Sequence, residues 1–232
     1  MYESRFFKID DPQIENFIYN LPKSWWSRRY EYEWVKNFAK PNDIALDAAS
    51  GIVHPLRFWL ARHCKDVYSC DIDSNIIKDL TSISLSQFQI DEHELQKIFP
   101  IPHNLHSNLA SLTKLPYKNC FFDKIYCISV LEHLQDNFNK FFLSPLYFSI
   151  TSFFLKKDIF LSLKEFFRVL KPGGYILLTF DYPDISLKYL DFCVQKIGFK
   201  FVSSFNTKID NSTLSVNTRG RNYKIFRAVL VK

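Results

Sequence analysis

The sequence predicts an α/β protein with a mostly parallel sheet. Apolar runs typical of buried strands alternate with segments of helical periodicity along most of the 232 residues. Several of the strand runs are continuously apolar, as strands buried on both faces are. The last two strand-like segments, near 199–206 and 223–231, have no helix-length segment between them. We therefore expect them to pair antiparallel at one edge of the sheet.

The first half of the chain supplies two strands and the helices around them. Aromatic side chains recur at helical spacing among charges in Trp25–Val35, which indicates a helix within residues 1–40. A turn at 41–43 leads into a short buried strand at 44–47. Pro55 suits the first turn of the next helix. The following strand is predicted at 67–71.

The region after the second strand is less regular. Ser74 is a candidate N-cap for a helix whose apolar stripe includes Ile76, Leu80 and Ile83. A short strand is expected near 103–107, and the apolar run 124–129 predicts another.

The last third of the chain repeats the alternation of helix and strand. Asp158 is a candidate cap for a helix with an apolar face that includes Leu163. The KPGG sequence at 171–174 predicts a tight turn before a buried strand at 175–181. A further helix ends at Gly198.

The composition is that of a globular protein with unusually many aromatic residues. Hydrophobic residues make up 47% and charged residues 23% of the chain, and aromatic residues make up 17%, with 24 Phe and 12 Tyr. Two interpretations stay open: a compositional bias, or a pocket lined by aromatic side chains for an apolar or planar substrate.

Charge, cysteines and hydropathy narrow the choice of partners. The net charge of +6 allows anionic partners but shows no dense basic block, so a nucleic-acid partner is not expected. Five cysteines without a CxxC pair suggest neither a disulfide framework nor a metal site. The N-terminus does not resemble a secretory signal, and no stretch is typical of a transmembrane helix. A reduced cytoplasm is the expected location.

Polar residues follow the predicted strands where an α/β sheet binds its ligand. In such sheets the ligand lies beyond the carboxyl ends of the strands. The first strand ends at Asp47, and the second ends at Asp71, at a distance along the chain that suits hydrogen bonds to a ribose diol. The third strand leads to Asn108, and the fourth ends at Ser129.

The motifs resemble those of a known enzyme family. LDAASG, VYSCDID, LPYKNCFFDKIYC, VLEHL and EFFRVLKPGG occur in the order and at roughly the spacing found in class I S-adenosylmethionine-dependent methyltransferases of the small-molecule type 11. The resemblance runs from about residue 42 to the C-terminus. It implies a Rossmann-like sheet of seven strands with a reversed last strand and helices on both faces. The expected division is an N-terminal helical lid or cap at 1–40 and a methyltransferase domain at 41–232.

The resemblance also implies which residues would hold S-adenosylmethionine (SAM) and its product S-adenosylhomocysteine (SAH). The methionine part of the cofactor would meet the first strand end and the turn after it, the ribose would meet the second strand end, and the adenine would lie between the second and third. The residues implied, with His54 added for its place beside the turn, are Asp47, Ala49, Gly51, His54, Asp71, Ile72, Asn108, Ser129 and Val130.

The glycine-rich turn departs from the family pattern. Ala49, Gly51 and Val53 stand where three glycines are usual. Glycine there permits close approach and unusual dihedrals. Either the turn follows a different path, or cofactor binding is weakened. His54 is either a packing residue or a contact to cofactor or substrate.

Two further segments are candidates for the acceptor site. In the family, the segment before the first strand often folds over the cofactor, which makes Trp25, Trp26, Arg29, Tyr30 and Tyr32 candidate lid residues; packing on the core is the alternative. The aromatic-rich insertion at about 135–157 could be a lid, a dimer interface, a membrane-surface element or plain packing.

The predicted reaction is an in-line transfer of a methyl group to a small-molecule acceptor, with a hydroxyl oxygen as the expected target, in a biosynthetic pathway. Histidine is a common base at neutral pH. The catalytic candidates are His133, Asp181 and Tyr182. No metal is expected, and a homodimer is possible. The alternatives are a non-catalytic scaffold or partner subunit, and an RNA-directed methyltransferase.

Overall fold

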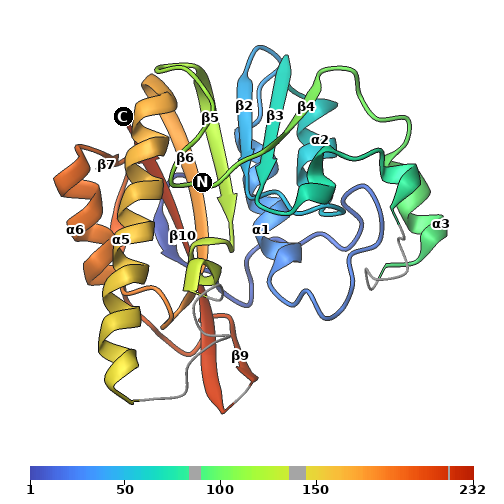
Figure 1. Cartoon of the computed structure of the whole chain (residues 1–232). Helices are drawn as coiled ribbons and strands as arrows, with labels where there is room; N and C mark the ends of the chain where they lie inside the picture. Colours follow the sequence, from blue (N-terminus) through green and yellow to red (C-terminus); the bar gives the residue numbers. More distant parts are fainter. Residues whose placement is uncertain (84–89, 136–144, 219) are drawn as a thin grey trace.

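A computed structural model describes residues 1–83, 90–135, 145–218 and 220–232 (Figure 1). Its centre is a mixed sheet in which five parallel strands lie side by side in the order β4-β3-β2-β5-β6. Their bounds are β2 (Ile44–Ala48), β3 (Asp66–Asp71), β4 (Leu105–Leu109), β5 (Phe122–Ile128) and β6 (Leu170–Tyr182).

The strand that follows β6 in the sheet is reversed, as predicted. β10 (Arg221–Val231) runs antiparallel to β6, and the short β7 (Lys200–Phe201) pairs antiparallel with β10. These seven strands reproduce the predicted sheet, and the α/β fold class is confirmed.

Three short strands were not expected from the sequence. β1 (Ser4–Phe6) pairs antiparallel with β10, β8 (Phe205–Asn206) pairs parallel with β1, and β9 (Ser215–Thr218) forms a hairpin with β10. Within the described residues the sheet thus has ten strands. β1 therefore places the start of the chain next to β10, at the end of the strand order away from β4.

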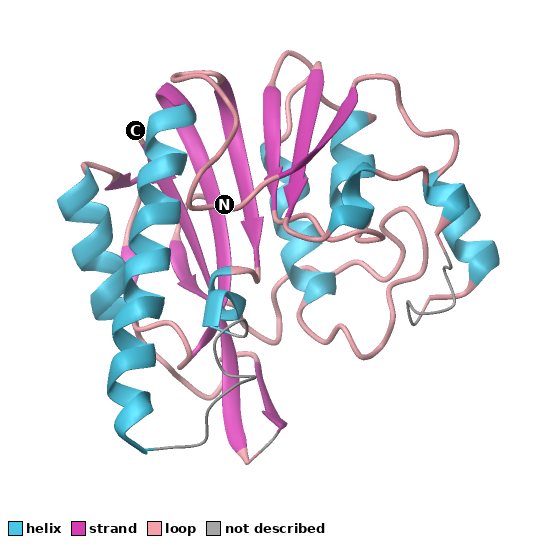
Figure 2. Ribbon diagram, in the orientation of Figure 1, coloured by secondary structure: helices cyan, strands magenta, loops and turns pink. Residues whose placement is uncertain are grey.

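Helices cover both faces of the sheet (Figure 2). α5 (Pro145–Val169) and α6 (Leu187–Ile197) pack on one face, where Leu163 and Leu190 share a core with Cys127 and Leu178. α1 (Arg28–Val35) and α2 (Leu56–Ala61) pack on the other face. There Val35 and Leu60 meet the alternate strand residues, such as Tyr126 and Leu177. The period of two along each strand therefore divides the apolar core into two layers.

The helix predicted after β3 is replaced by two 3-10 turns, η2 (Ser74–Ile77) and η3 (Leu80–Ser82). Asp73, not Ser74, is the cap of the first, because its side chain accepts a hydrogen bond from the backbone of Asn75. Asp79 has an extended backbone and accepts from Thr81 in the same way, which ends the first turn and starts the second.

The cap predicted at Asp158 is also wrong. This residue lies inside α5, which begins at Pro145, a residue suited to a helix start. Of the insertion predicted at about 135–157, residues 136–144 lie outside the described residues, and residues 145–157 form the first part of α5. The remaining short helices are η1 (Lys36–Phe38), α3 (Glu92–Leu95), η5 (Gln96–Ile98) and η6 (Leu131–Gln135). In the part of the chain described, no helix is long and apolar enough to cross a membrane.

Candidate active site

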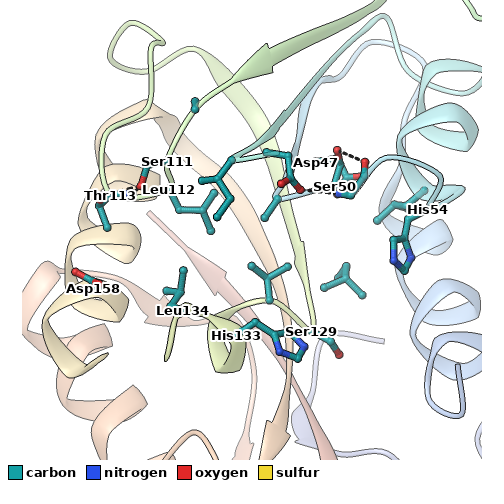
Figure 3. A pocket seen from close by; sticks show the side chains of 18 of the residues that line it. Asp47, Ser50, His54, Ser111, Leu112, Thr113, Ser129, His133, Leu134 and Asp158 are labelled. Atoms are coloured by element: carbon teal, nitrogen blue, oxygen red, sulfur yellow. Dashed lines mark hydrogen bonds between the residues drawn. The ribbon is translucent and has the colours of Figure 1, made fainter. Parts of the chain in front are cut away.

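A cavity of about 420 Å³ opens where the parallel strands β2, β3 and β5 end (Figure 3). It lies at the carboxyl edge of the sheet, where α/β proteins bind ligands. Its walls come from the turn after β2, the end of β3, the segment after β4, the turn after β5, and the helices α1 and α5. The lining residues are Arg28, Tyr32, Asp47, Ala49, Ser50, Gly51, His54, Leu56, Asp71, Ile72, Ala110, Ser111, Leu112, Thr113, Ile128, Ser129, Val130, His133, Leu134 and Asp158.

The turn after β2 needs its one remaining glycine. Gly51 has φ of 63°, and a Cβ there would come within 2.6 Å of the His54 Cδ2 atom. Its backbone N–H donates to Asp71 Oδ2 at 2.9 Å. Ala49 also has a positive φ, of 55°, so it adopts the left-handed conformation that glycine accepts without a steric penalty.

The third position of the glycine pattern points away from the cavity. Val53 is 2% exposed and packs in a small core of its own, while the Tyr19 hydroxyl donates to its carbonyl at 2.6 Å. The guanidinium of Arg57 donates to the carbonyl of Ile52 at 2.5 Å. Side chains from residue 19 and helix α2 thus hold the turn in this conformation.

Asp47 has an unsatisfied oxygen at the cavity. The residue is 3% exposed, and its Oδ2 atom has no hydrogen-bond partner. Burial raises the pKa of this carboxyl to about 7; the negative charge of Asp71 adds to the shift and the Arg57 guanidinium opposes it. Buried polar atoms are nearly always paired in native proteins, so an orphan at a cavity indicates a position for a ligand donor.

Asp71 is fixed by the backbone on both of its oxygens. Oδ2 accepts from Gly51 and Oδ1 accepts from Asp73 at 3.0 Å. Each oxygen keeps a further lone pair, which leaves the carboxylate able to accept from a diol. Ile72, next to it, is 61% exposed at the cavity rim.

His54 is held neutral between aromatic residues. Its ring stacks on Trp25 at 4.2 Å between centroids, and its Nδ1 lies 3.1 Å from the Tyr32 hydroxyl. Burial lowers the pKa of His54 to about 3, and the positive charges of Arg28 and Arg57 contribute to the same shift. The imidazole therefore forms an uncharged wall of the cavity.

Glu31 joins α1 to the sheet inside the protein. Its side chain is fully buried, with Oε2 accepting from Arg28 at 2.6 Å and Oε1 accepting from the hydroxyls of Ser129, at 2.6 Å, and Thr179. Glu31 therefore fixes Arg28 and Ser129, both of which line the cavity.

A second cavity, of about 260 Å³, adjoins the first. The two share Arg28, His54, Ser129 and His133. The residues that belong to the second cavity alone are Ser24, Trp25, Trp26, Ser27, Glu132 and Asp181.

Two carboxyl groups of the second cavity have raised pKa values. Glu132 is 5% exposed, and burial raises its pKa to about 8, with the charge of Asp181 contributing. Burial likewise raises the pKa of Asp181 to about 6, with the charge of Glu31 next in importance. Perturbed carboxyls in a cleft are typical of functional sites.

The structure brings most of the predicted site residues together. Eight of the nine cofactor candidates and Tyr32 line the first cavity, and Trp25, Trp26 and Asp181 line the second, while His133 borders both. Asn108 is the exception among the cofactor candidates. It lies within β4 with its Oδ1 atom accepting from Tyr117, and the segment after the strand, 110–113, lines the cavity in its place.

Three other candidates lie elsewhere. Tyr182 follows Asp181 in β6, so its side chain takes the opposite face, where it packs on Phe6. Arg29 pairs with Glu15 at 3.6 Å, and the Tyr30 hydroxyl donates to the carbonyl of residue 9. These two residues lie on the side of α1 away from the cavities, and their assignment to the lid is corrected accordingly.

Three charged residues of the cavities, Arg28, Glu132 and Asp158, were missed, as was the buried Glu31 that pairs with Arg28. Arg28 and Glu31 lie on the inward stripe of α1, and Glu132 is adjacent to the predicted His133. Asp158 was interpreted as a cap. The i, i+3, i+4 spacing of Arg28, Glu31 and Tyr32 places the three side chains on one stripe of α1, and this spacing is the signal by which Arg28 and Glu31 could have been predicted.

The strand order and the cavity at the carboxyl edge define a Rossmann-like α/β protein with a ligand site at the sheet's switch point. Residues 46–144 match the family model described as a methyltransferase domain. This match and the Rossmann-like fold support the family and the enzyme class that the sequence predicts.

Solved structures show the same fold at low identity. The [4+2]-cyclase SpnF is 12% identical with a TM-score of 0.58, over 100% of this chain and 87% of that one. A SAM-dependent methyltransferase from Methanosarcina mazei is 17% identical with a TM-score of 0.53, over 86% and 96%. Magnesium protoporphyrin IX methyltransferase from Synechocystis PCC 6803 is 16% identical with a TM-score of 0.51, over 85% of this chain and 74% of that one. None of the curated protein sequences matches the chain.

Proposed function

We propose that this chain transfers the methyl group of SAM to a hydroxyl oxygen of a small-molecule acceptor. The observation that carries the proposal is the orphaned Oδ2 atom of Asp47 in a cavity that Asp71 also borders. An ammonium group, such as that of the methionine part of SAM, would donate to Asp47 and favour its charged form. A ribose diol would donate to Asp71. The residues present therefore fit this cofactor.

Other groups of the first cavity suit the remaining parts of the cofactor. The Arg28 guanidinium, fixed by Glu31, lies where it can meet a carboxylate. Ile72 and the segment 110–113 supply the apolar and backbone surfaces for a planar base. When bound, SAM supplies an electrophilic methyl group on a sulfonium, and what the protein contributes is position and a dry site.

The second cavity is the proposed acceptor site. It meets the first at His54 and Ser129, so an acceptor placed there would approach the cofactor from the side of β5 and β6. In the transfer, a bond forms between the acceptor oxygen and the methyl carbon while the carbon–sulfur bond breaks. The hydroxyl proton leaves to a base, for which His133 is the first candidate because it borders both cavities, and Asp181, whose pKa lies near 6, is the second.

The fold alone does not define the reaction, since a cyclase also has it. Calorimetric titration of SAH into the full chain tests the cofactor part directly. We expect micromolar affinity, about −8 kcal/mol, and a loss of at least about 100-fold in Asp71→Ala, because both the ribose acceptor and the anchor of Gly51 disappear.

Asp91→Ala is the matched control, because Asp91 is a capping aspartate of α3 outside both cavities. It should bind SAH as the unaltered protein does. Failure of the folded, unaltered chain to bind SAH would reject the proposal and favour the non-catalytic scaffold. Equal affinity in Asp71→Ala would show that the cofactor lies elsewhere.

A further inference from the structure

The second cavity has a distinctive chemical character. Two indoles, Trp25 and Trp26, line it together with the carboxyl groups of Glu132 and Asp181. Aromatic faces combined with carboxylates are the groups with which proteins bind organic cations. The cavity is small, so the group that it recognises is compact.

Glu132 provides an unsatisfied acceptor at this cavity. Its Oε1 atom accepts from the backbone N–H of Asp181 at 3.1 Å, whereas its Oε2 atom is buried and has no partner. The side chain is 5% exposed, so solvent does not satisfy this oxygen. A bound donor would supply the missing hydrogen bond and, if charged, would also stabilise both carboxylates.

The positive groups at the cavity offset these carboxyls only in part: Arg28 acts against the raised pKa of both, and His133 acts against that of Asp181, yet both pKa values stay raised. Arg28 borders the cavity, but its guanidinium is paired with the fully buried Glu31 at 2.6 Å. His54 is neutral between Trp25 and Tyr32. An anionic acceptor would therefore meet two carboxyl groups beside a guanidinium that Glu31 already pairs, while a cationic one would favour the charged form of both carboxyls.

We infer that the acceptor is a hydroxyl compound that also carries a protonated amine, and that Glu132 binds this amine. The inference rests on the proposed function and names the substrate class of the same site. The ammonium would donate to the Oε2 atom of Glu132 beside Asp181, with the indoles of Trp25 and Trp26 around it. Held in this way, the acceptor turns its hydroxyl toward the junction of the two cavities at His54 and Ser129.

Three probes with one ring and different charges test the inference. Tyramine, 4-ethylphenol and 4-hydroxyphenylacetate share a phenol and carry an ammonium, no charge and a carboxylate, respectively. Each is titrated calorimetrically into the SAH-saturated chain. We expect tyramine to bind at least about 10-fold more tightly than 4-ethylphenol, and 4-hydroxyphenylacetate to bind more weakly than both.

The Glu132→Gln variant separates the recognition of charge from the recognition of shape. It should remove most of the preference for tyramine and leave the affinity for 4-ethylphenol within about 2-fold, since the neutral probe makes no ion pair. Glu33→Gln, on the outer part of α1 where Glu33 pairs with Lys36, is the control and should change neither. The comparison of the three probes on the unaltered protein does not depend on how well the variant folds.

The outcomes distinguish the two proposals. Absence of SAH binding in the first titration would reject the proposed function and the inference with it. SAH binding together with equal affinity for tyramine and 4-ethylphenol, with a preference for 4-hydroxyphenylacetate, or with no binding of any probe would overturn the inference and leave the cofactor assignment standing.

Discussion

The two cavities meet at His54 and Ser129 but are built in different ways. The first is formed mainly by turns that directly follow β2, β3, β4 and β5, and backbone groups fix its key carboxylate, Asp71. The second is formed by side chains from three distant segments, at residues 24–28, around residue 132, and at Asp181.

This difference bears on how readily each cavity could change between related proteins. A cavity made by strand ends keeps its form as long as the sheet does, because the backbone sets its shape. A cavity made by side chains on separate segments changes whenever one of those segments changes. The family match at 46–144 covers the strand ends that form most of the first cavity, and it omits residues 24–28 and Asp181 of the second.

The largest expected effect concerns Glu31, which connects the two regions. Glu31→Ala leaves the Arg28 guanidinium unpaired in a largely buried place and removes the acceptor of the Ser129 and Thr179 hydroxyls. We expect a loss of about 3–5 kcal/mol in the free energy of unfolding, measured with urea.

Glu33→Ala on the same helix is the control for helix propensity and net charge. Glu33 pairs with Lys36 at the surface, so its removal should cost less than about 1 kcal/mol. Similar losses in the two variants would show that the buried contacts of Glu31 do not hold α1 on the sheet.

A smaller effect concerns the pH dependence of stability, to which one carboxyl group in each cavity contributes. Asp47 in the first cavity and Glu132 in the second have pKa values raised to about 7 and 8 in the folded chain. The folded state therefore retains protons that the unfolded state has already lost, and stability falls as pH rises through these values. His54, with its lowered pKa, acts in the opposite direction, but only below about pH 6.5.

Between pH 6.5 and 8 we thus expect the free energy of unfolding to decrease, with Glu132 contributing on the order of 1 kcal/mol. Glu132→Gln should remove that part of the slope in urea titrations at a series of pH values. Glu94→Gln is the control, since Lys97 lowers the pKa of Glu94 and this carboxyl group therefore does not titrate in this range. An unchanged slope in Glu132→Gln would mean that Glu132 is ionised throughout.

Much of the fold and of the first cavity could be predicted because the relevant signals are local. Asp47 and Asp71 end strands that are visible as apolar runs, and parallel strand ends must meet at one edge. The three-residue strand β1 has too few positions for a pattern, and its pairing with β10 links opposite ends of the chain.

The second cavity could not be predicted to the same depth. Glu31 contacts Ser129 and Thr179, which are 98 and 148 residues away in the sequence, and no periodicity indicates such contacts. Tyr182 was wrongly predicted to face the site. Consecutive residues of a strand point to opposite faces, and the sequence does not show which face of β6 borders the cavity. Asn108 was misplaced because β4 continues one residue beyond it.

The central claim is that the first cavity holds the cofactor by its orphaned carboxyl oxygen and leaves the second free for an acceptor. The crystal structure of the full chain with SAH tests it most directly. We predict the methionine ammonium within about 3 Å of the Asp47 Oδ2 atom, the ribose at Asp71, and no part of SAH between Trp26 and Glu132. SAH bound in the second cavity, or bound with the Asp47 oxygen still without a partner, would contradict the account.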